Sequence, residues 1–138
     1  MKMDISQLSQ LDDFAQSFSH TLNFGDIIFL QGDLGSGKTT FTQLLLKHLG
    51  YKDRVKSPTY ALYESYQLPK FTVVHMDLYR LSSPEELYYL AIDEIIDNQN
   101  IVIIEWPEKG KGVLPKASKT ITFELVNALC RTLSLDFT

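Results

Sequence analysis

The chain has 138 residues, of which 44% are hydrophobic and 22% are charged, and its formal net charge is -4. This composition is typical of one soluble globular domain with a buried core, so we expect residues 1–138 to form a single domain. The negative charge disfavours a surface that binds nucleic acid unaided. The single cysteine excludes an intramolecular disulfide. The N-terminus is too polar for a signal peptide and no apolar run is long enough to cross a membrane, so we expect a cytoplasmic protein.

The first part of the chain predicts a helix, a strand, a glycine-rich loop and a second helix. Apolar residues recur at helical spacing as far as Leu22, and Ser9 is the expected N-cap of this helix. Residues 26–30, with the sequence DIIFL, predict a buried strand that runs straight into the loop. The apolar positions of residues 41–49 mark one face of a helix, and Gly50 is placed to end it. A strand, a glycine-rich turn and a helix in this order form a βα unit of an α/β sheet.

The middle of the chain predicts further strands and one more helix. Residues 57–68 predict a loop followed by a β-prone run, and residues 71–77 predict another strand. Residues 83–86, with the sequence SPEE, provide an N-cap, a proline in the first turn and a glutamate that reaches back, which indicates a helix start. Residues 100–106 predict a buried strand that is apolar on both faces, as strands of parallel sheets tend to be.

The C-terminal segment, residues 119–138, contains two β-rich runs and predicts an antiparallel hairpin that turns around Val126 and Asn127. All these elements, together with the glycine-rich sequence GDLGSGKT between the strand and the helix, predict an α/β fold of the P-loop NTPase type. We expect a mixed, mostly parallel sheet that is flanked by helices and carries this hairpin at its C-terminal end.

The glycine-rich loop, Gly32 to Thr39, matches the phosphate-binding pattern G-x-x-x-x-G-K-[ST] in full. Its glycines let the backbone N–H groups approach phosphate oxygens, and the start of the following helix adds its positive end. Lys38 is expected to reach the β- and γ-phosphates, and the Thr39 hydroxyl is expected to bind Mg²⁺. The residues expected to contact the nucleotide here, the first four mainly through backbone, are Asp33, Leu34, Gly35, Ser36, Gly37, Lys38, Thr39 and Thr40.

Two carboxylates at predicted strand ends, Asp77 and Glu105, are candidates to complete the site, because a P-loop needs an acidic group near its Mg²⁺. Each is also compatible with an ordinary solvated strand end. Glu105 directly precedes Trp106, which suggests a fixed position, so we favour it together with Thr39 for the metal. Asp77 is expected to orient the attacking water or to hold a metal ligand in place. We therefore expect Lys38, Asp77 and Glu105 to be catalytic.

His75 lies two residues before Asp77 on the same face of the predicted strand. We expect it to be a structural histidine whose hydrogen bonds are satisfied, because that is the common role of a histidine in a buried strand.

The residues alone leave the class of P-loop protein open. The N-K-x-D tetrapeptide with which GTPases recognise guanine does not occur. Small-molecule kinases need room for an acceptor and commonly use several arginines, whereas this chain has only Arg54, Arg80 and Arg131 and no segment long enough for an acceptor domain. The sequence therefore indicates a compact nucleotide hydrolase or nucleotide-driven switch, with a small-molecule kinase as the alternative.

Four motifs give the chain a resemblance to the TsaE family, small ATPases that assist synthesis of threonylcarbamoyladenosine in tRNA. They are GDLGSGKTTF, VKSPTYAL, HMDLYRLSSPEEL and IEWPEKGKGVLP, and they occur in the family's order. The resemblance implies that Thr39 and Glu105 bind Mg²⁺ and that the S-P-T loop acts as a switch that brings Thr59 near the γ-phosphate of ATP. An ordinary turn is the alternative for that loop.

The resemblance also implies further residues and partners. It places Asp77, Arg80 and Trp106 near the active site, and it matches Arg131 to an arginine of the last strand that approaches the nucleotide. The implied partners are TsaD, the transferase that modifies tRNA, and TsaB, with which TsaD pairs. ATP binding and hydrolysis would then change how this protein, monomeric on its own, holds those partners, and contact with tRNA would be indirect. The ATPase would be slow alone and stimulated by the complex.

Overall fold

The computed structural model describes residues 2–53, 55 and 62–137. Its elements in chain order are β1 (Lys2–Asp4), α1 (Leu8–Ser19), β2 (Ile27–Gln31), α2 (Lys38–His48), β3 (Tyr63–Gln67), β4 (Thr72–Asp77), the 3-10 helix η1 (Pro84–Leu90), α3 (Ile92–Ile95), β5 (Ile101–Glu105), the 3-10 helix η2 (Pro107–Gly110), β6 (Lys119–Asn127) and β7 (Cys130–Phe137). The strands predicted before the glycine-rich loop and ending at the two candidate carboxylates are present, and so is the helix after the loop.

The strands of the described residues form one sheet in the order β1-β7-β6-β2-β5-β4-β3. Its centre is parallel, because β2 pairs with both β5 and β6, and β4 pairs with β5. Its edges are antiparallel, because β3 pairs with β4 and β7 pairs with β6 and β1. The sheet is mixed, as the sequence predicts. The carboxyl ends of β2, β4, β5 and β6 therefore share one edge, where ligands of α/β proteins bind.

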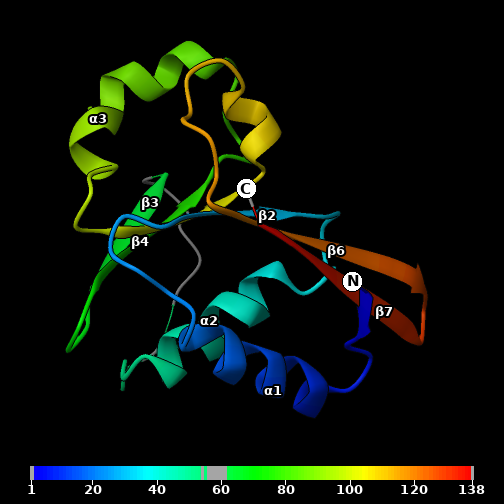
Figure 1. The fold of residues 1–138 in the computed structure, drawn as a ribbon. Helices are drawn as coiled ribbons and strands as arrows, with labels where there is room; N and C mark the ends of the chain where they lie inside the picture. The colour runs from blue at the N-terminus through cyan, green and yellow to red at the C-terminus, as the bar shows by residue number, and fades with distance from the viewer. Residues whose placement is uncertain (1, 54, 56–61, 138) are drawn as a thin grey trace.

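Helices cover both faces of the sheet (Figure 1). The α1–α2 pair lies on one face, whereas η1, α3 and η2 lie on the other. This arrangement explains why every residue of β5 is buried, as expected for a central strand that is apolar on both faces. None of the described helices is long and apolar enough to cross a membrane.

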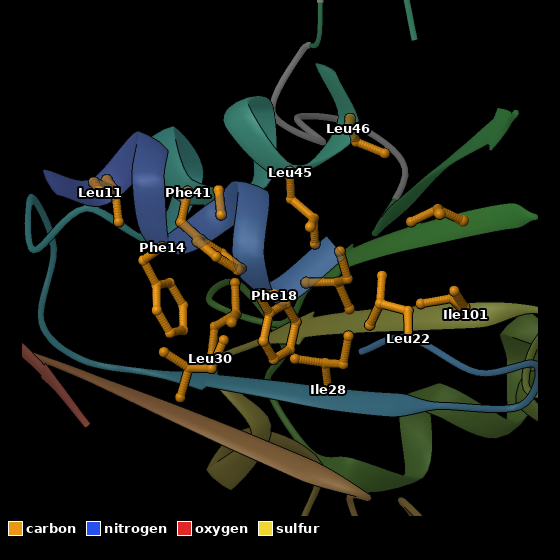
Figure 2. Close-up of a cluster of buried hydrophobic side chains, with 14 of the residues drawn as sticks. Leu11, Phe14, Phe18, Leu22, Ile28, Leu30, Phe41, Leu45, Leu46 and Ile101 are labelled. Carbon is orange, nitrogen blue, oxygen red and sulfur yellow. The ribbon is translucent and has the colours of Figure 1, made fainter. Parts of the chain in front are cut away.

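The core beneath α1 and α2 consists of aliphatic and aromatic side chains (Figure 2). Phe14 and Phe18 project from α1, and the ring centroid of each lies 5.7 Å from that of Phe41 in α2. Fully burying such a side chain contributes about 1.5–3 kcal/mol to the free energy of folding. This packing fixes α2, and with it the glycine-rich loop at its start, against the sheet.

The start of α1 differs from the prediction of a Ser9 N-cap, because the helix begins at Leu8 and its N-cap is Gln7. The Gln7 N–H donates to the side-chain Oε1 of Gln10 at 2.8 Å. That amide supplies the acceptor that a helix N-terminus needs, so Ser9 lies inside the first turn, where its side chain is exposed.

The helix start predicted at residues 83–86 is present, although the helix that follows is of the 3-10 type. Pro84 occupies the first turn, and Glu86 Oε2 accepts hydrogen bonds from the N–H groups of Ser82 and Ser83 at 2.6 and 3.1 Å. The buried Leu87 of this helix packs in the core of the second face. Glu86 therefore reaches back to the start of the helix, as the sequence predicts.

The predicted C-terminal hairpin is present, with β6 ending at Asn127 and β7 beginning at Cys130. Its turn comes two residues later than predicted, because the side-chain Oδ1 of Asn127 accepts the N–H of Leu129 at 2.9 Å and so forms a turn after Asn127. The sequence analysis did not predict β1, which adds to the free edge of β7.

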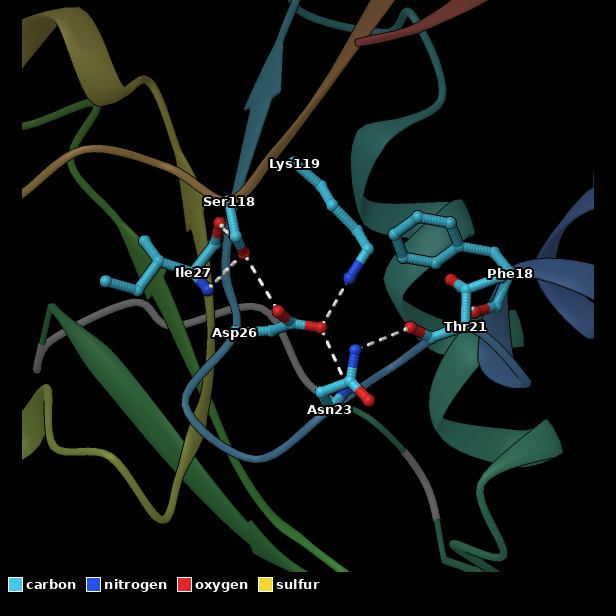
Figure 3. A network of polar contacts seen from close by, with 7 residues as sticks. All are labelled: Phe18, Thr21, Asn23, Asp26, Ile27, Ser118 and Lys119. Carbon is cyan, nitrogen blue, oxygen red and sulfur yellow. Dashed lines mark hydrogen bonds and ion pairs between the residues drawn. The ribbon is translucent and has the colours of Figure 1, made fainter. Parts of the chain in front are cut away.

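A buried polar network joins the start of β2 to the start of β6 (Figure 3). Lys119 Nζ lies 2.5 Å from Asp26 Oδ2, and their side chains are only 7% and 10% exposed. The other oxygen of Asp26 accepts the Ser118 hydroxyl at 3.0 Å, and Oδ2 also accepts the N–H of Asn23 at 2.8 Å. The network lies at the opposite end of β2 from the glycine-rich loop, so it fixes two central strands without occupying the ligand edge.

Candidate functional site

The loop between β2 and α2 has a backbone that only glycine allows at its first position. Gly32 has φ of 146°, and a Cβ there would lie 2.7 Å from the carbonyl oxygen of Phe123 in the neighbouring strand β6. Gly37, at the other end of the loop, has φ of 116° and lies over the Phe123 ring. The loop therefore packs directly against the adjacent strand, and its glycines allow this close approach without a steric clash.

The start of α2 offers hydrogen-bond donors to an anion. Gly37 is its N-cap and has no side chain to accept the first N–H groups of the helix. The hydroxyl oxygen of Ser36 is buried and has no hydrogen-bond partner among the described residues. Backbone N–H groups that no side chain caps and the positive end of a helix suit a phosphate group.

A cleft of about 340 Å³ opens at this edge of the sheet. It joins the loop, the start of α2, the ends of β4 and β5, and the start of β7. Its lining residues are Leu34, Gly35, Gly37, Lys38, Thr39, Thr40, Asp77, Glu105, Trp106 and Arg131. All of them are among the site residues expected from the sequence, so the fold brings these separate motifs to one place.

Lys38 is held at the cleft by two contacts. Its Nζ donates to the carbonyl oxygen of Gly32 at 2.5 Å and lies 3.9 Å from the centroid of the Trp106 ring. Burial lowers the pKa of Lys38, and the carboxylates of Glu105 and Asp77 oppose that shift. The ammonium thus lies in a partly desolvated place where a phosphate would interact with it more strongly than in bulk water.

Asp77 and Glu105 end neighbouring parallel strands and are paired in register. Glu105 is buried, with 3% of its surface exposed, whereas Asp77 is half-buried. Burial raises the pKa of Asp77; the N–H of Tyr79, which donates to Asp77 Oδ1 at 3.0 Å, opposes the shift, and the nearby Glu105 carboxylate adds to it. Two carboxylates on paired positions of neighbouring strands favour a cation between or beside them.

His75 differs from the expectation of a histidine with satisfied hydrogen bonds. Its Nε2 lies 2.5 Å from Oε2 of Glu105, and the ring is fully buried. Its Nδ1 is also buried, but has no hydrogen-bond partner among the residues that the structure describes. The contact with Glu105 could not be predicted from the sequence, because the two residues are 30 positions apart and meet only through the register of their strands.

Trp106 directly follows Glu105 in a left-handed backbone conformation, with φ of 57°. A residue other than glycine or asparagine is rarely found there, and such strain is held by the surrounding structure. Tyr79 packs on the indole with the ring centroids 5.1 Å apart. Sequence analysis missed Tyr79 as a neighbour of the site; its position two residues after Asp77 was the available signal.

Four expected site residues lie elsewhere or outside the described chain. Asp33 is exposed and Ser36 is buried beneath the loop, and neither lines the cleft. Arg80 is exposed and lines a different depression, together with Leu62 and Glu86. Thr59 lies outside the described residues. The structure therefore brings Arg131, rather than Arg80, to the candidate phosphate site.

Comparison with known proteins identifies the family. The family model described as threonylcarbamoyl adenosine biosynthesis protein TsaE matches residues 5–132. The chain belongs to the TsaE family.

Individual relatives agree with this assignment to the TsaE family. The chain is similar to a Haemophilus influenzae tRNA threonylcarbamoyladenosine biosynthesis protein TsaE, with 44% identity over 71% of this chain and 62% of that protein. It is 35% identical to the TsaE protein of Borreliella burgdorferi over 93% and 94% of the two chains. The crystal structure of Bacillus subtilis YdiB superposes with a TM-score of 0.82 at 25% identity, over 98% of this chain and 83% of YdiB.

Proposed function

We propose that this chain is a magnesium-dependent ATPase that assists the synthesis of threonylcarbamoyladenosine in tRNA. The observation that carries the proposal is one cleft that joins the Lys38 ammonium, the uncapped start of α2 and the carboxylates of Asp77 and Glu105. Membership of the TsaE family supplies the biological setting, because its relatives are named for this modification.

Each residue of the cleft has a role that follows from its chemistry. Lys38 and the free N–H groups at the start of α2 bind the phosphates. The Thr39 hydroxyl and the Glu105 carboxylate are oxygen ligands of the kind that Mg²⁺ prefers, and the bound ion neutralises phosphate charge. Asp77 orients the water that attacks the γ-phosphate, and its raised pKa makes it a better proton acceptor than an exposed aspartate. Arg131 contributes positive charge from β7.

Adenine is the base that we propose, because the chain lacks the N-K-x-D tetrapeptide with which GTPases recognise guanine. The proposed partners are a TsaD-like transferase and a TsaB-like protein in the cytoplasm, with ATP binding and hydrolysis controlling how this chain holds them. The negative net charge fits that arrangement, since tRNA would bind mainly to the partners.

The proposal is tested in two steps. Titration calorimetry with ATP and GTP, each with Mg²⁺ and with EDTA, should show binding that Mg²⁺ strengthens and that favours ATP. Capture of purified TsaD and TsaB should then depend on whether ATP, a non-hydrolysable analogue or ADP is present. Tighter binding of GTP would reject the ATPase assignment, and phosphorylation of a small acceptor in a metabolite screen would instead support the small-molecule kinase.

A further inference from the structure

The contact between His75 and Glu105 is buried and directional. The two side chains are 0% and 4% exposed, and Nε2 of His75 lies 2.5 Å from Oε2 of Glu105. A carboxylate accepts hydrogen bonds, so the ring proton lies on Nε2, and this N–H donates a hydrogen bond to Oε2. The imidazole and the carboxylate therefore fix each other in a place where water does not compete.

The sheet determines this geometry. In the parallel β4–β5 pair, His75 lies opposite Ile103 and Asp77 lies opposite Glu105. Side chains two residues apart on a strand share a face. His75 therefore approaches Glu105 from inside the sheet, two residues before the strand ends that border the cleft. The bond engages Oε2 of Glu105, a residue that also lines the cleft.

We propose that His75 is a positioning residue that orients the Glu105 carboxylate for a divalent cation. The inference rests on the proposed function, because it takes Glu105 as a ligand of Mg²⁺. Binding a metal must order the rotatable bonds of a glutamate side chain, which costs conformational entropy. A hydrogen bond that already fixes the carboxylate lowers that entropy cost. His75 itself touches neither the metal nor the nucleotide. Among the described residues Nδ1 has no hydrogen-bond partner, so the bond to Glu105 is the one that orients the ring.

Three substitutions at this position separate the hydrogen bond from simple packing. His75→Gln keeps an N–H donor at a reach similar to Nε2, His75→Asn keeps a polar amide that is too short, and His75→Phe keeps a ring without a donor. The probe is Mn²⁺ in place of Mg²⁺, bound to the full chain together with ATP. Electron paramagnetic resonance gives both the Mn²⁺ affinity and the symmetry of its ligand environment, independently of turnover. ATP binding in EDTA reports on the fold and the loop.

The proposal predicts that His75→Phe and His75→Asn weaken Mn²⁺ binding by about 10- to 100-fold and change its spectrum, as loss of a residue that holds a metal ligand typically does. His75→Gln should stay within a few-fold of the natural protein, and metal-free ATP binding should be unchanged in all three. Unchanged Mn²⁺ affinity in His75→Phe, or His75→Gln as weak as His75→Asn, would overturn it. Equal loss of metal-free binding in all three variants would show a packing role and overturn it too. If the natural protein bound ATP equally well with and without a metal, the proposed function would fail first.

Discussion

Asp77 and Glu105 lie directly opposite each other across the β4–β5 ladder, so two carboxylates of different burial share one edge of the cleft. The more buried Glu105 is fixed by His75, whereas the half-buried Asp77 accepts the local N–H of Tyr79. A fixed carboxylate suits a metal ligand and a more solvated one suits contact with water. This difference in surroundings supports different roles for two residues that look alike in the sequence.

The first prediction separates those roles by mutation. Glu105→Ala should weaken Mg²⁺-dependent ATP binding as well as hydrolysis, because it removes a ligand of the metal. Asp77→Ala should slow hydrolysis by about 100-fold or more, the contribution typical of a general base, and leave ATP binding largely intact. Calorimetry and steady-state turnover measure the two effects. The opposite pattern would exchange the assignments, and small equal effects would make both residues ordinary strand ends.

The second prediction concerns stability without ligand. Burial raises the pKa of Asp77 above the ordinary 3.8, so the folded state binds the proton more tightly than the unfolded state does. The favourable contribution of the protonated group is complete below pH 3.8 and is lost as the pH rises through the raised pKa. Asp77→Asn cannot ionise, so at neutral pH it should be more stable than the natural protein by about 0.5–1 kcal/mol.

Urea denaturation across a pH series checks this prediction. The stability gap should close as the pH falls toward the ordinary pKa of aspartate. Asp13→Asn, at an exposed position of α1, is the matched control and should change stability by no more than about 0.5 kcal/mol. A destabilised Asp77→Asn at neutral pH would mean that the charged form of Asp77 stabilises the fold.

The third prediction uses Trp106, the only tryptophan of the chain. The Lys38 ammonium lies 3.9 Å from its ring centroid, a cation–π contact worth about 0.5–2 kcal/mol. A phosphate in the cleft would compete for that ammonium, so ATP binding should change the intrinsic fluorescence of Trp106. Lys38→Ala should abolish the response, whereas Lys47→Ala, exposed at the far end of α2, should retain it. A natural protein that binds ATP with no fluorescence change would show that Lys38 stays on the ring.

The fold could be predicted where local patterns are strong. The apolar run of β5, the phosphate-binding loop and the capping glutamate of η1 each carry their own signal, and each lies where the sequence indicates. The short strand β1 has no such pattern, because its three residues are fixed only by pairing with β7 at the other end of the chain. A strand that depends on pairing with a distant segment cannot be predicted from the residues next to it in the sequence.

The candidate site shows the same division. The residues that line the cleft were identified from motifs, yet the motifs could not tell which arginine would reach it. Arg80 lies close in sequence to Asp77 but turns to another depression, whereas Arg131 reaches the cleft because the hairpin brings back β7 beside β6. The bond between His75 and Glu105 likewise follows from strand register alone.

The fourth prediction concerns the buried pair of Lys119 and Asp26. Lys119→Met removes the cation and leaves a buried carboxylate that Ser118 and Asn23 only partly compensate. Breaking one side of a buried ion pair costs about 3–5 kcal/mol, so the variant should be much less stable in urea. Lys119→Met combined with Asp26→Asn should recover part of that loss, because no charge is left unpaired. A small effect of the single substitution would show that water reaches Asp26 and replaces the lysine.

The fifth prediction separates Arg131 from Arg80. The backbone of Arg131 is fixed at the β1–β7 edge, where its N–H donates to the Ser6 hydroxyl at 3.0 Å and its carbonyl accepts the N–H of Ile5 at 2.9 Å. Its side chain lines the cleft but is exposed. Arg131→Ala should therefore weaken ATP binding about tenfold, the lower end for a hydrogen bond to a charged group. Arg80→Ala is the matched control and should leave the ATP affinity of the isolated chain unchanged.

The Arg80→Ala variant also tests whether a partner completes the site. An arginine that neutralises charge on the γ-phosphate accelerates P-loop hydrolases by about 10³- to 10⁵-fold, and the exposed Arg80 lies outside the cleft in the isolated chain. We therefore expect slow turnover alone and faster turnover with the TsaB–TsaD pair, because partner binding energy can select a conformation in which the site is complete. Turnover is measured for the natural chain and for Arg80→Ala, each with and without the pair. Loss of the stimulated rate in Arg80→Ala would assign Arg80 to the partner-bound state, and full activity of the isolated chain, unchanged by the pair, would reject partner control.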